Sequence, residues 1–219
     1  MKPFDRISYF LYNHIGAIVF AVLFLGIVGG VSCSFFFNNK TCDFALAVVN
    51  SYADKSDMEM SDDLTSFFGL DGKKHYAYVD TGYQISYQWE DETVENTAAD
   101  ESFSEKFFLN ISHGAMDAAI IPESYYEYCN SIEDIFYDIE YLFSKEEVAA
   151  MKPRLVKGSG DFAEYYRGIR VDDCEYLKKT GITFIDANKD DAYILVFPIG
   201  SGHKNNIKKF METEIGILE

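Results

Sequence analysis

The chain has 219 residues, of which 48% are hydrophobic and 16% aromatic, and its 36 acidic and 19 basic side chains give a formal net charge of −17. A protein this acidic repels phosphate backbones, so the composition excludes nucleic-acid binding. The many aromatic residues exclude a disordered chain, because they supply enough apolar area for a core.

The charge is unevenly distributed along the chain. Residues 1–40 hold three basic residues and one acid, so the −17 of the whole chain leaves −19 for residues 41–219. No Asp, Glu, Lys or Arg occurs from Leu11 to Asn39. We therefore divide the chain into a cytoplasmic tail (residues 1–14), a transmembrane helix (15–37) and an exported acidic domain (41–219).

The apolar stretch Ile15–Phe37 has the length and composition of a membrane-spanning helix. About 20 residues suffice to cross a bilayer, and 14 of these 23 residues are Leu, Ile, Val or Phe. At roughly −0.3 to −0.6 kcal/mol for each such residue, insertion is favourable by about 4 to 8 kcal/mol. A cleaved signal peptide and a lipoprotein signal that uses Cys33 are the alternatives, and all three interpretations export the acidic domain.

The flanking charges predict the orientation of this helix. Lys2 and Arg6 precede it, whereas Lys40 follows it and is soon balanced by Asp43. The positive-inside rule then places the N-terminus in the cytoplasm and the C-terminal domain outside the cell. The expected partners are the bilayer and a transporter or other membrane protein.

Apolar patterns and helix caps predict alternating strands and helices in the exported part. In chain order, we expect a buried strand at Asp43–Asn50, a helix from Ser61 that stops at Gly69, strands at Lys74–Asp80 and Tyr83–Trp89 joined by a turn at Thr81-Gly82, a loop at Glu90–Glu101, a helix at Phe103–Ser112, a buried strand at Ala115–Ile121, a helix from Pro122, a capped helix from Ser144 to Met151, a helix at Asp172–Lys179, a strand at Ala192–Phe197 and a basic-faced helix at Asn205–Ile215. This alternation predicts an α/β domain with a mixed, partly parallel sheet.

The residue types that carry catalysis are scattered. No G-x-S-x-G motif occurs, and none of the four histidines has a nucleophile or carboxylate partner at a recognisable spacing. The exported cysteines Cys42, Cys129 and Cys174 are odd in number, which excludes a disulfide framework and leaves open whether Cys129 and Cys174 meet. No cysteine has a His at metal-ligand spacing, so we expect no metal site. Because the catalytic residue types are scattered, we also expect no cofactor and no enzymatic activity.

One stretch carries a resemblance to a known family. A helix followed by Gly114–Glu123 (GAMDAAIIPE) resembles a segment of type II periplasmic solute-binding proteins. Tyr166–Ile169 and the strand Tyr193–Phe197 with its closing helix look like the returning portion of that fold in small membrane-anchored members from Gram-positive bacteria. The resemblance implies a non-enzymatic binding protein with two lobes around a cleft, and the short chain implies a reduced version.

Within this resemblance the expected ligand-binding residues are Asp117, Glu123, Tyr125 and Tyr126. Asp117 precedes a buried strand, and the other three follow its carboxyl end, where ligands of open α/β sheets gather. The alternative roles are structural: Asp117 accepts backbone N–H bonds, and the tyrosines pack in the core. The sequence thus favours a solute-binding-like receptor or accessory transporter subunit, with a cell-envelope docking protein as the alternative.

Overall fold

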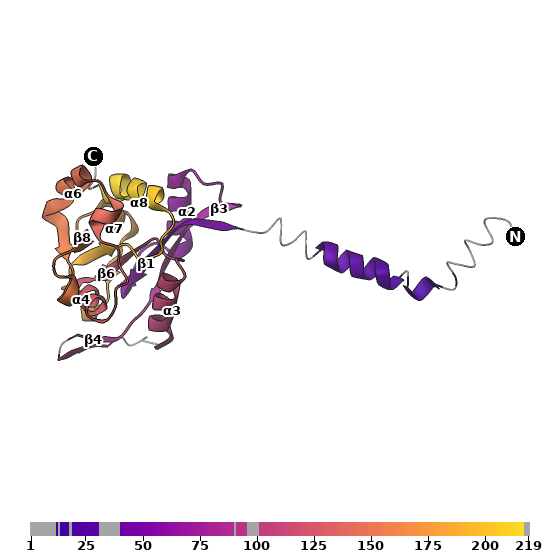
Figure 1. Cartoon of the computed structure of the whole chain (residues 1–219), viewed down its shortest axis with the longest axis horizontal. Coiled ribbons are helices and arrows are strands. Elements are labelled where there is room, and N and C mark those ends of the chain that lie inside the picture. The colour runs from indigo at the N-terminus through magenta and orange to yellow at the C-terminus, as the bar shows by residue number, and fades with distance from the viewer. Residues whose placement is uncertain are drawn as a thin grey trace. The chain divides into compact units, whose positions relative to one another are not determined.

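The computed structural model describes residue 12 and residues 14–17, 19–30, 40–89, 91–95 and 101–216 (Figure 1). The chain divides into two compact units, Met1–Thr41 and Cys42–Glu219. In the first unit, residues 14–17 and 19–30 are helical. None of the helices described is long and apolar enough to span a bilayer. The predicted span at residues 15–37 includes residues 18 and 31–37, which lie outside the described residues.

The second unit is built on a six-stranded mixed sheet, which confirms the predicted α/β class. Its strand order is β3 (His75–Tyr83), β1 (Thr41–Val49), β6 (Ala118–Pro122), β10 (Tyr193–Val196), β8 (Tyr166–Arg170) and β7 (Leu155–Lys157). Strands β1 and β6 are parallel, with Leu46 opposite Ala118, whereas β10 is antiparallel to both β6 and β8, and β7 is antiparallel to β8.

Contacts at the two ends of β1 give the direction of β3. The Asp43 carboxylate lies 2.8 Å from His75 Nδ1, and the Asn50 N–H donates to the Tyr83 carbonyl over 2.8 Å. The start of β1 therefore meets the start of β3, and the two strands are parallel.

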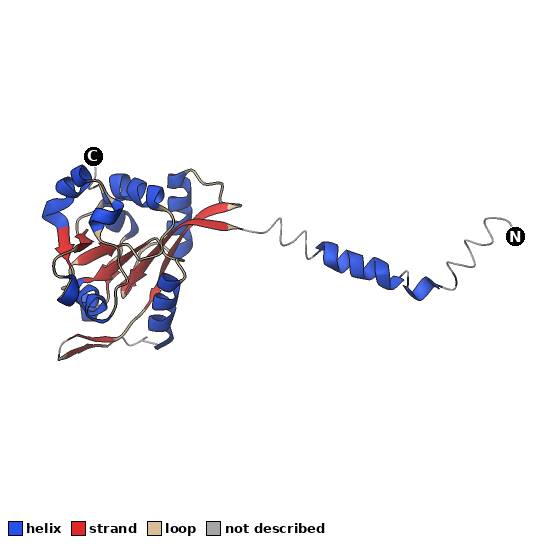
Figure 2. Cartoon of the chain, viewed as in Figure 1, coloured by secondary structure: helices blue, strands red, loops and turns tan. Residues whose placement is uncertain are grey.

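Helices cover both faces of the sheet, as Figure 2 shows. They are α2 (Asp57–Phe68), α3 (Glu101–Ser112), α4 (Glu123–Ile132), α5 (Ile139–Leu142), α6 (Lys145–Met151), α7 (Glu175–Thr180) and α8 (Lys204–Phe210), which continues as the π-helical turn η4 (Met211–Ile215). Short 3₁₀ turns are η1 (Lys152–Arg154), η2 (Gly160–Phe162) and η3 (Asp186–Asn188). Strand β2 (Ser51–Tyr52) pairs with β9 (Thr183–Phe184), and β4 (Tyr87–Trp89) pairs with β5 (Glu92–Val94).

The side chains of β1 point alternately into two hydrophobic cores. Phe44, Leu46 and Val48 pack on the face that α2 covers, where Met60 and Leu64 meet them. Ala47 and Val49 pack on the other face with Phe107 and Ile111 of α3. A strand buried on both faces is expected where helical crossovers cover both sides of parallel strands.

Several predicted boundaries are wrong. Helix α2 starts at Asp57 rather than at Ser61, because Ser56 and Glu59 form a capping box that begins the helix one turn earlier. The predicted turn at Thr81-Gly82 is absent: β3 runs through it, and the Asp57 carboxylate holds the Thr81 hydroxyl at 2.7 Å. The predicted loop at Glu90–Glu101 contains β5, while residues 90 and 96–100 lie outside the described residues.

Other boundaries follow the local signals in the sequence. The capping box at Ser144 and Glu147 begins α6 as predicted. Gly69 and Gly181 end α2 and α7 in the left-handed conformation. Helix α7 begins at Glu175, three residues later than the predicted start at Asp172.

Cys42, Cys129 and Cys174 are free, and they lie in different environments. Cys129 packs in the core on the α3 face and Cys174 in the core on the α2 face, so the sheet separates the two thiols and excludes a bridge between them. Cys42 is partly buried in β1, and its thiol donates to the Phe44 carbonyl. Burial raises the pKa of Cys42 to about 11.

This raised pKa predicts slow alkylation of Cys42. At pH 8 a thiol with a pKa near 11 is thiolate in only about 0.1% of molecules, so iodoacetamide should react about a hundredfold more slowly than with an ordinary cysteine. The rate should rise about tenfold per pH unit up to pH 10. Mass spectrometry of the full chain carrying Cys33→Ser measures it, with the urea-unfolded chain as control; equal folded and unfolded rates would contradict the assignment.

Gly114 combines a left-handed backbone with a tight contact. Its φ is +63°, and a Cβ built there would lie 2.7 Å from the Gly200 carbonyl oxygen. Gly69 has a similar φ of +72°, but its Cβ would meet no atom within 4 Å. The two positions therefore separate backbone strain from steric collision.

We expect Gly69→Ala to lower the free energy of unfolding by about 1 kcal/mol, from backbone strain alone. Gly114→Ala should cost about 1–3 kcal/mol more, because the α3–β6 turn must move away from Gly200. Urea unfolding of the full chain in detergent micelles measures both values. Equal losses would show that the close approach of Gly114 and Gly200 does not constrain the fold.

Candidate functional site

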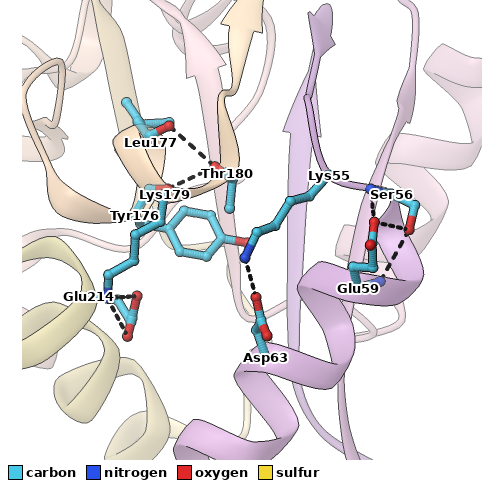
Figure 3. A network of polar contacts seen from close by, with 9 residues as sticks. All are labelled: Lys55, Ser56, Glu59, Asp63, Tyr176, Leu177, Lys179, Thr180 and Glu214. Carbon is cyan, nitrogen blue, oxygen red and sulfur yellow. Dashed lines mark hydrogen bonds and ion pairs between the residues drawn. The ribbon is translucent and has the colours of Figure 1, made fainter.

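A small cavity of about 130 Å³ lies where α2, α7 and η4 meet (Figure 3). Its described lining consists of Lys55, Met60, Asp63, Leu64, Tyr176, Lys179, Thr180 and Glu214. Met60, Leu64 and Tyr176 belong to the core that α2 covers, so the cavity lies over that face of the sheet.

The backbone fixes the two halves of this cavity against each other. The N–H groups of Asp54 and Lys55 both donate to the Thr180 carbonyl, over 3.1 and 3.3 Å. Gly181 is required next to this contact, because a Cβ there would lie 2.1 Å from the Asp54 carboxylate. These bonds hold the end of α7 against the start of α2, and they place Lys55 in the lining of the cavity.

Two ion pairs flank the cavity. Lys55 Nζ lies 2.6 Å from Asp63 Oδ2, and Lys179 Nζ lies 3.3 Å from Glu214 Oε2 (Figure 3). Both lysines are partly exposed, whereas the Glu214 side chain is only 12% exposed. Ion pairs at a solvated rim contribute about 1 kcal/mol or less to stability. Breaking either ion pair therefore costs little free energy, and a ligand would meet both ammonium and carboxylate groups at the cavity.

The Tyr176 hydroxyl is buried and has no hydrogen-bond partner among the described residues. Its ring packs edge-on against Phe210, with ring centres 5.3 Å apart. Burial, and next the neighbouring Glu214 carboxylate, raise the pKa of Tyr176 far above its ordinary value. The hydroxyl therefore stays protonated and is able to donate a hydrogen bond.

The remaining lining groups complete the chemistry of the cavity. Met60 and Leu64 are fully buried and form an apolar floor. The Thr180 hydroxyl donates to the Tyr176 carbonyl over 2.7 Å, so it offers a ligand only its lone pairs. The described lining contains no His, Cys or Ser.

The four residues predicted from the sequence lie elsewhere. Asp117 precedes β6, and Glu123 follows it at the start of α4, so the five-residue strand separates them by roughly 17–20 Å. Tyr125 and Tyr126 are fully buried in the core on the α3 face. Glu123 forms an exposed ion pair with Arg170, over 2.7 Å. The structure does not bring the four together, and none of them lines the cavity at Tyr176.

Asp117 ties three segments of the domain together. Its buried carboxylate accepts hydrogen bonds from the Ala45 N–H at 2.9 Å and the Ser201 hydroxyl at 2.6 Å, and it contacts His203 Nδ1 at 3.0 Å. Ser201 thus bonds the carboxylate rather than the imidazole, which is not the nucleophile–base arrangement of a hydrolase. These contacts support the structural role that the sequence offered as the alternative.

A second polar cluster, which the sequence did not reveal, lies at the carboxyl ends of β1 and β6. Asn50, with a left-handed φ of +53°, holds the Ile85 backbone through both side-chain atoms, at 2.6 and 2.9 Å, and donates to Asn188 at 3.0 Å. Asn188 in turn donates to the Tyr87 hydroxyl and to Asp191, at 2.9 and 3.0 Å. This cluster anchors the segment before β4 to the sheet.

Comparison with known proteins gives no relative: no family model, no curated protein and no solved structure matches the chain. Function is therefore argued from the geometry of the described residues. The lining residues come from separate segments of the chain. Helical spacing joins Met60, Asp63 and Leu64 on α2, and it joins Tyr176, Lys179 and Thr180 on α7, but it does not connect the two sets.

The unpartnered hydroxyl predicts an unusual response to substitution. Tyr176→Phe should raise the free energy of unfolding by about 1 kcal/mol in the absence of ligand, because it removes a buried polar group without a partner. Tyr193→Phe is the matched control: its hydroxyl accepts the Phe184 N–H at 3.0 Å, so its loss should lower stability by about 1 kcal/mol. Urea unfolding of both variants tests the contrast, and a destabilised Tyr176→Phe would contradict it.

Proposed function

We propose that this is a single-pass membrane protein whose exported α/β domain binds a small zwitterionic solute in the cavity at Tyr176. It acts as a receptor or an accessory subunit of a transporter and catalyses no reaction. The observation that carries the proposal is the buried Tyr176 hydroxyl, which has no partner in a cavity flanked by charges of both signs.

The membrane anchor is the part of the proposal that rests on the sequence. The 23 residues Ile15–Phe37 contain no charged side chain, and the preceding basic residues favour a cytoplasmic N-terminus. The domain that follows carries −19 and is acidic enough to stay soluble in the extracellular space.

The resemblance to type II solute-binding proteins belongs to the same proposal. Of the three segments that carry it, Gly114–Glu123 and Tyr166–Ile169 contribute to β6 and β8, and both of these strands pair with β10, which the third segment, Tyr193–Phe197, forms. Residues Cys42–Glu219 form one compact unit, which favours a reduced, one-lobed version over two lobes that close around a cleft.

Size and charge favour the ligand class. A cavity of about 150 Å³ holds a molecule of about six non-hydrogen atoms, such as benzene, and the cavity at Tyr176 is close to that size. Lys55 and Lys179 suit a carboxylate, Asp63 and Glu214 suit an ammonium group, and the Tyr176 hydroxyl adds a directed donor. A small amino acid has these groups on a stem short enough to fit.

A ligand panel tests this proposal on the full chain in detergent micelles. A small amino acid at a hundred times its dissociation constant should stabilise the protein by about 2.7 kcal/mol, which corresponds to a thermal shift of about 5 °C or more. Amino acids, sugars, short peptides and metal ions form the panel. Tyr176→Phe and Lys179→Gln should abolish the shift while the protein stays folded.

Lys178→Gln is the matched control, because Lys178 lies on the same helix and its exposed ion pair with Glu175 is outside the cavity. Its thermal shift should equal that of the unsubstituted protein. A thermal shift that persists in Tyr176→Phe would show that the solute binds at a different site. A flat panel would contradict solute binding and favour the alternative, a domain that docks onto another membrane protein.

A further inference from the structure

A second cavity, of about 420 Å³, is lined by α6 and by the last two strands of the sheet, β8 and its edge strand β7. Four of its lining residues follow one another along a single helical face: Lys145, Val148, Ala149 and Lys152. They are spaced by three, one and three residues, and Lys152 keeps a right-handed helical backbone where α6 ends. The stripe that faces the cavity therefore has an apolar middle and an ammonium group at each end. We call this space the amphipathic cavity.

The walls around this stripe are apolar. Phe143 is buried at the end of α5, and Val148, Leu155 and Tyr166 are partly buried side chains at the margin of the core on the α2 face. Five of the eight lining residues in the described part of the chain are therefore apolar or aromatic, which is the usual composition of a pocket for an organic molecule. A ligand that covers this surface gains roughly 25 cal/mol for each Å² removed from water.

The charge of the amphipathic cavity is opposite to that of the chain as a whole. Neither Lys145 nor Lys152 forms an ion pair with a described acidic side chain, whereas Glu147 on the same helix is paired with Lys208 over 3.0 Å. Glu140 is the single carboxylate in the described lining. Two ammonium groups and one carboxylate give the lining a charge of +1, in a protein whose net charge is −17.

This combination selects among classes of ligand. A small inorganic anion would leave the apolar walls in contact with water, and a neutral hydrocarbon would leave both lysines without a counter-charge. A carboxylate on an aliphatic chain matches both features. A cavity that holds the six carbon atoms of benzene has about 150 Å³, and the amphipathic cavity is nearly three times as large, so a chain of about eight carbons fits.

We propose that the amphipathic cavity binds an aliphatic carboxylate of medium chain length. The chain lies against Val148, Leu155 and Tyr166, and the carboxylate faces the lysines at the ends of the helical stripe. The site shares no lining residue with the cavity at Tyr176 and does not depend on solute binding there.

Calorimetric titration of the full chain with octanoate tests this proposal. The protein is held in nanodiscs of zwitterionic lipid, because the alkyl chain of a detergent would compete for the apolar walls, and the heat from empty nanodiscs is subtracted. Lys145→Gln and Lys152→Gln should each weaken binding about fivefold, the effect of losing one charge partner at a solvated rim. Glu140→Gln should tighten binding two- to fivefold, because it removes the carboxylate that repels the ligand. Thermal melts check that all three variants are folded.

Two further ligands separate the contribution of the chain from that of the charge. Butyrate lacks four methylene groups and should bind at least tenfold more weakly than octanoate. Octylamine has the same chain with the opposite charge and should also bind at least tenfold more weakly. Octylamine that binds as tightly as octanoate would overturn the ligand class.

Two control variants separate the site from general charge and from the proposed function. Lys178→Gln removes an exposed ammonium group from α7, and Tyr176→Phe alters the other cavity; both should bind octanoate as the unsubstituted protein does. Equal affinity of Lys152→Gln and Lys178→Gln would overturn the site. Heat no greater than that of empty nanodiscs would overturn the proposal as a whole, whatever the outcome of the amino-acid panel.

Discussion

The burial of β1 on both of its faces is the constraint on which the rest of the domain depends. Because β1 places apolar side chains in a core on each face of the sheet, a helix must cover each face. Helix α2 covers one face and α3 covers the other. Because the strand lies between β3 and β6, both of its edges are also hydrogen-bonded. Polar groups are then confined to its ends: Asp117 meets Ala45 near one end, and Asn50 follows the other.

The sequence predicted those features that local physics determines. The capping box at Ser144 and the left-handed glycine Gly69 each depend on a few neighbouring residues, and the structure has both where they were expected. The turn at Thr81-Gly82 failed because the side chain of Asp57, distant in the sequence, holds Thr81 in an extended strand. Tertiary contacts overrode a local preference there, as they often do in sheets.

The candidate sites were less accessible to prediction. Asp117 was noticed because it precedes a buried strand, yet its role depends on Ser201 and His203, which follow β10 much later in the chain. The cavity at Tyr176 combines a helix start, a helix end and a π-helical turn from separate parts of the chain. The sequence spacing of the lining residues does not predict that these three segments meet. An unsatisfied buried atom, such as the Tyr176 hydroxyl, is a property of the packed structure alone.

The positions of the three thiols allow the domain to fold without forming disulfide bonds. Cys129 and Cys174 are on opposite sides of the sheet, and Cys42 lies in β1. The fold of the described domain is therefore held by packing and hydrogen bonds, with no covalent cross-link among these three residues. Such a domain reaches the same native state in reducing and in oxidising surroundings. Its folding would need no thiol oxidase, and its stability would not change with the redox potential of the medium.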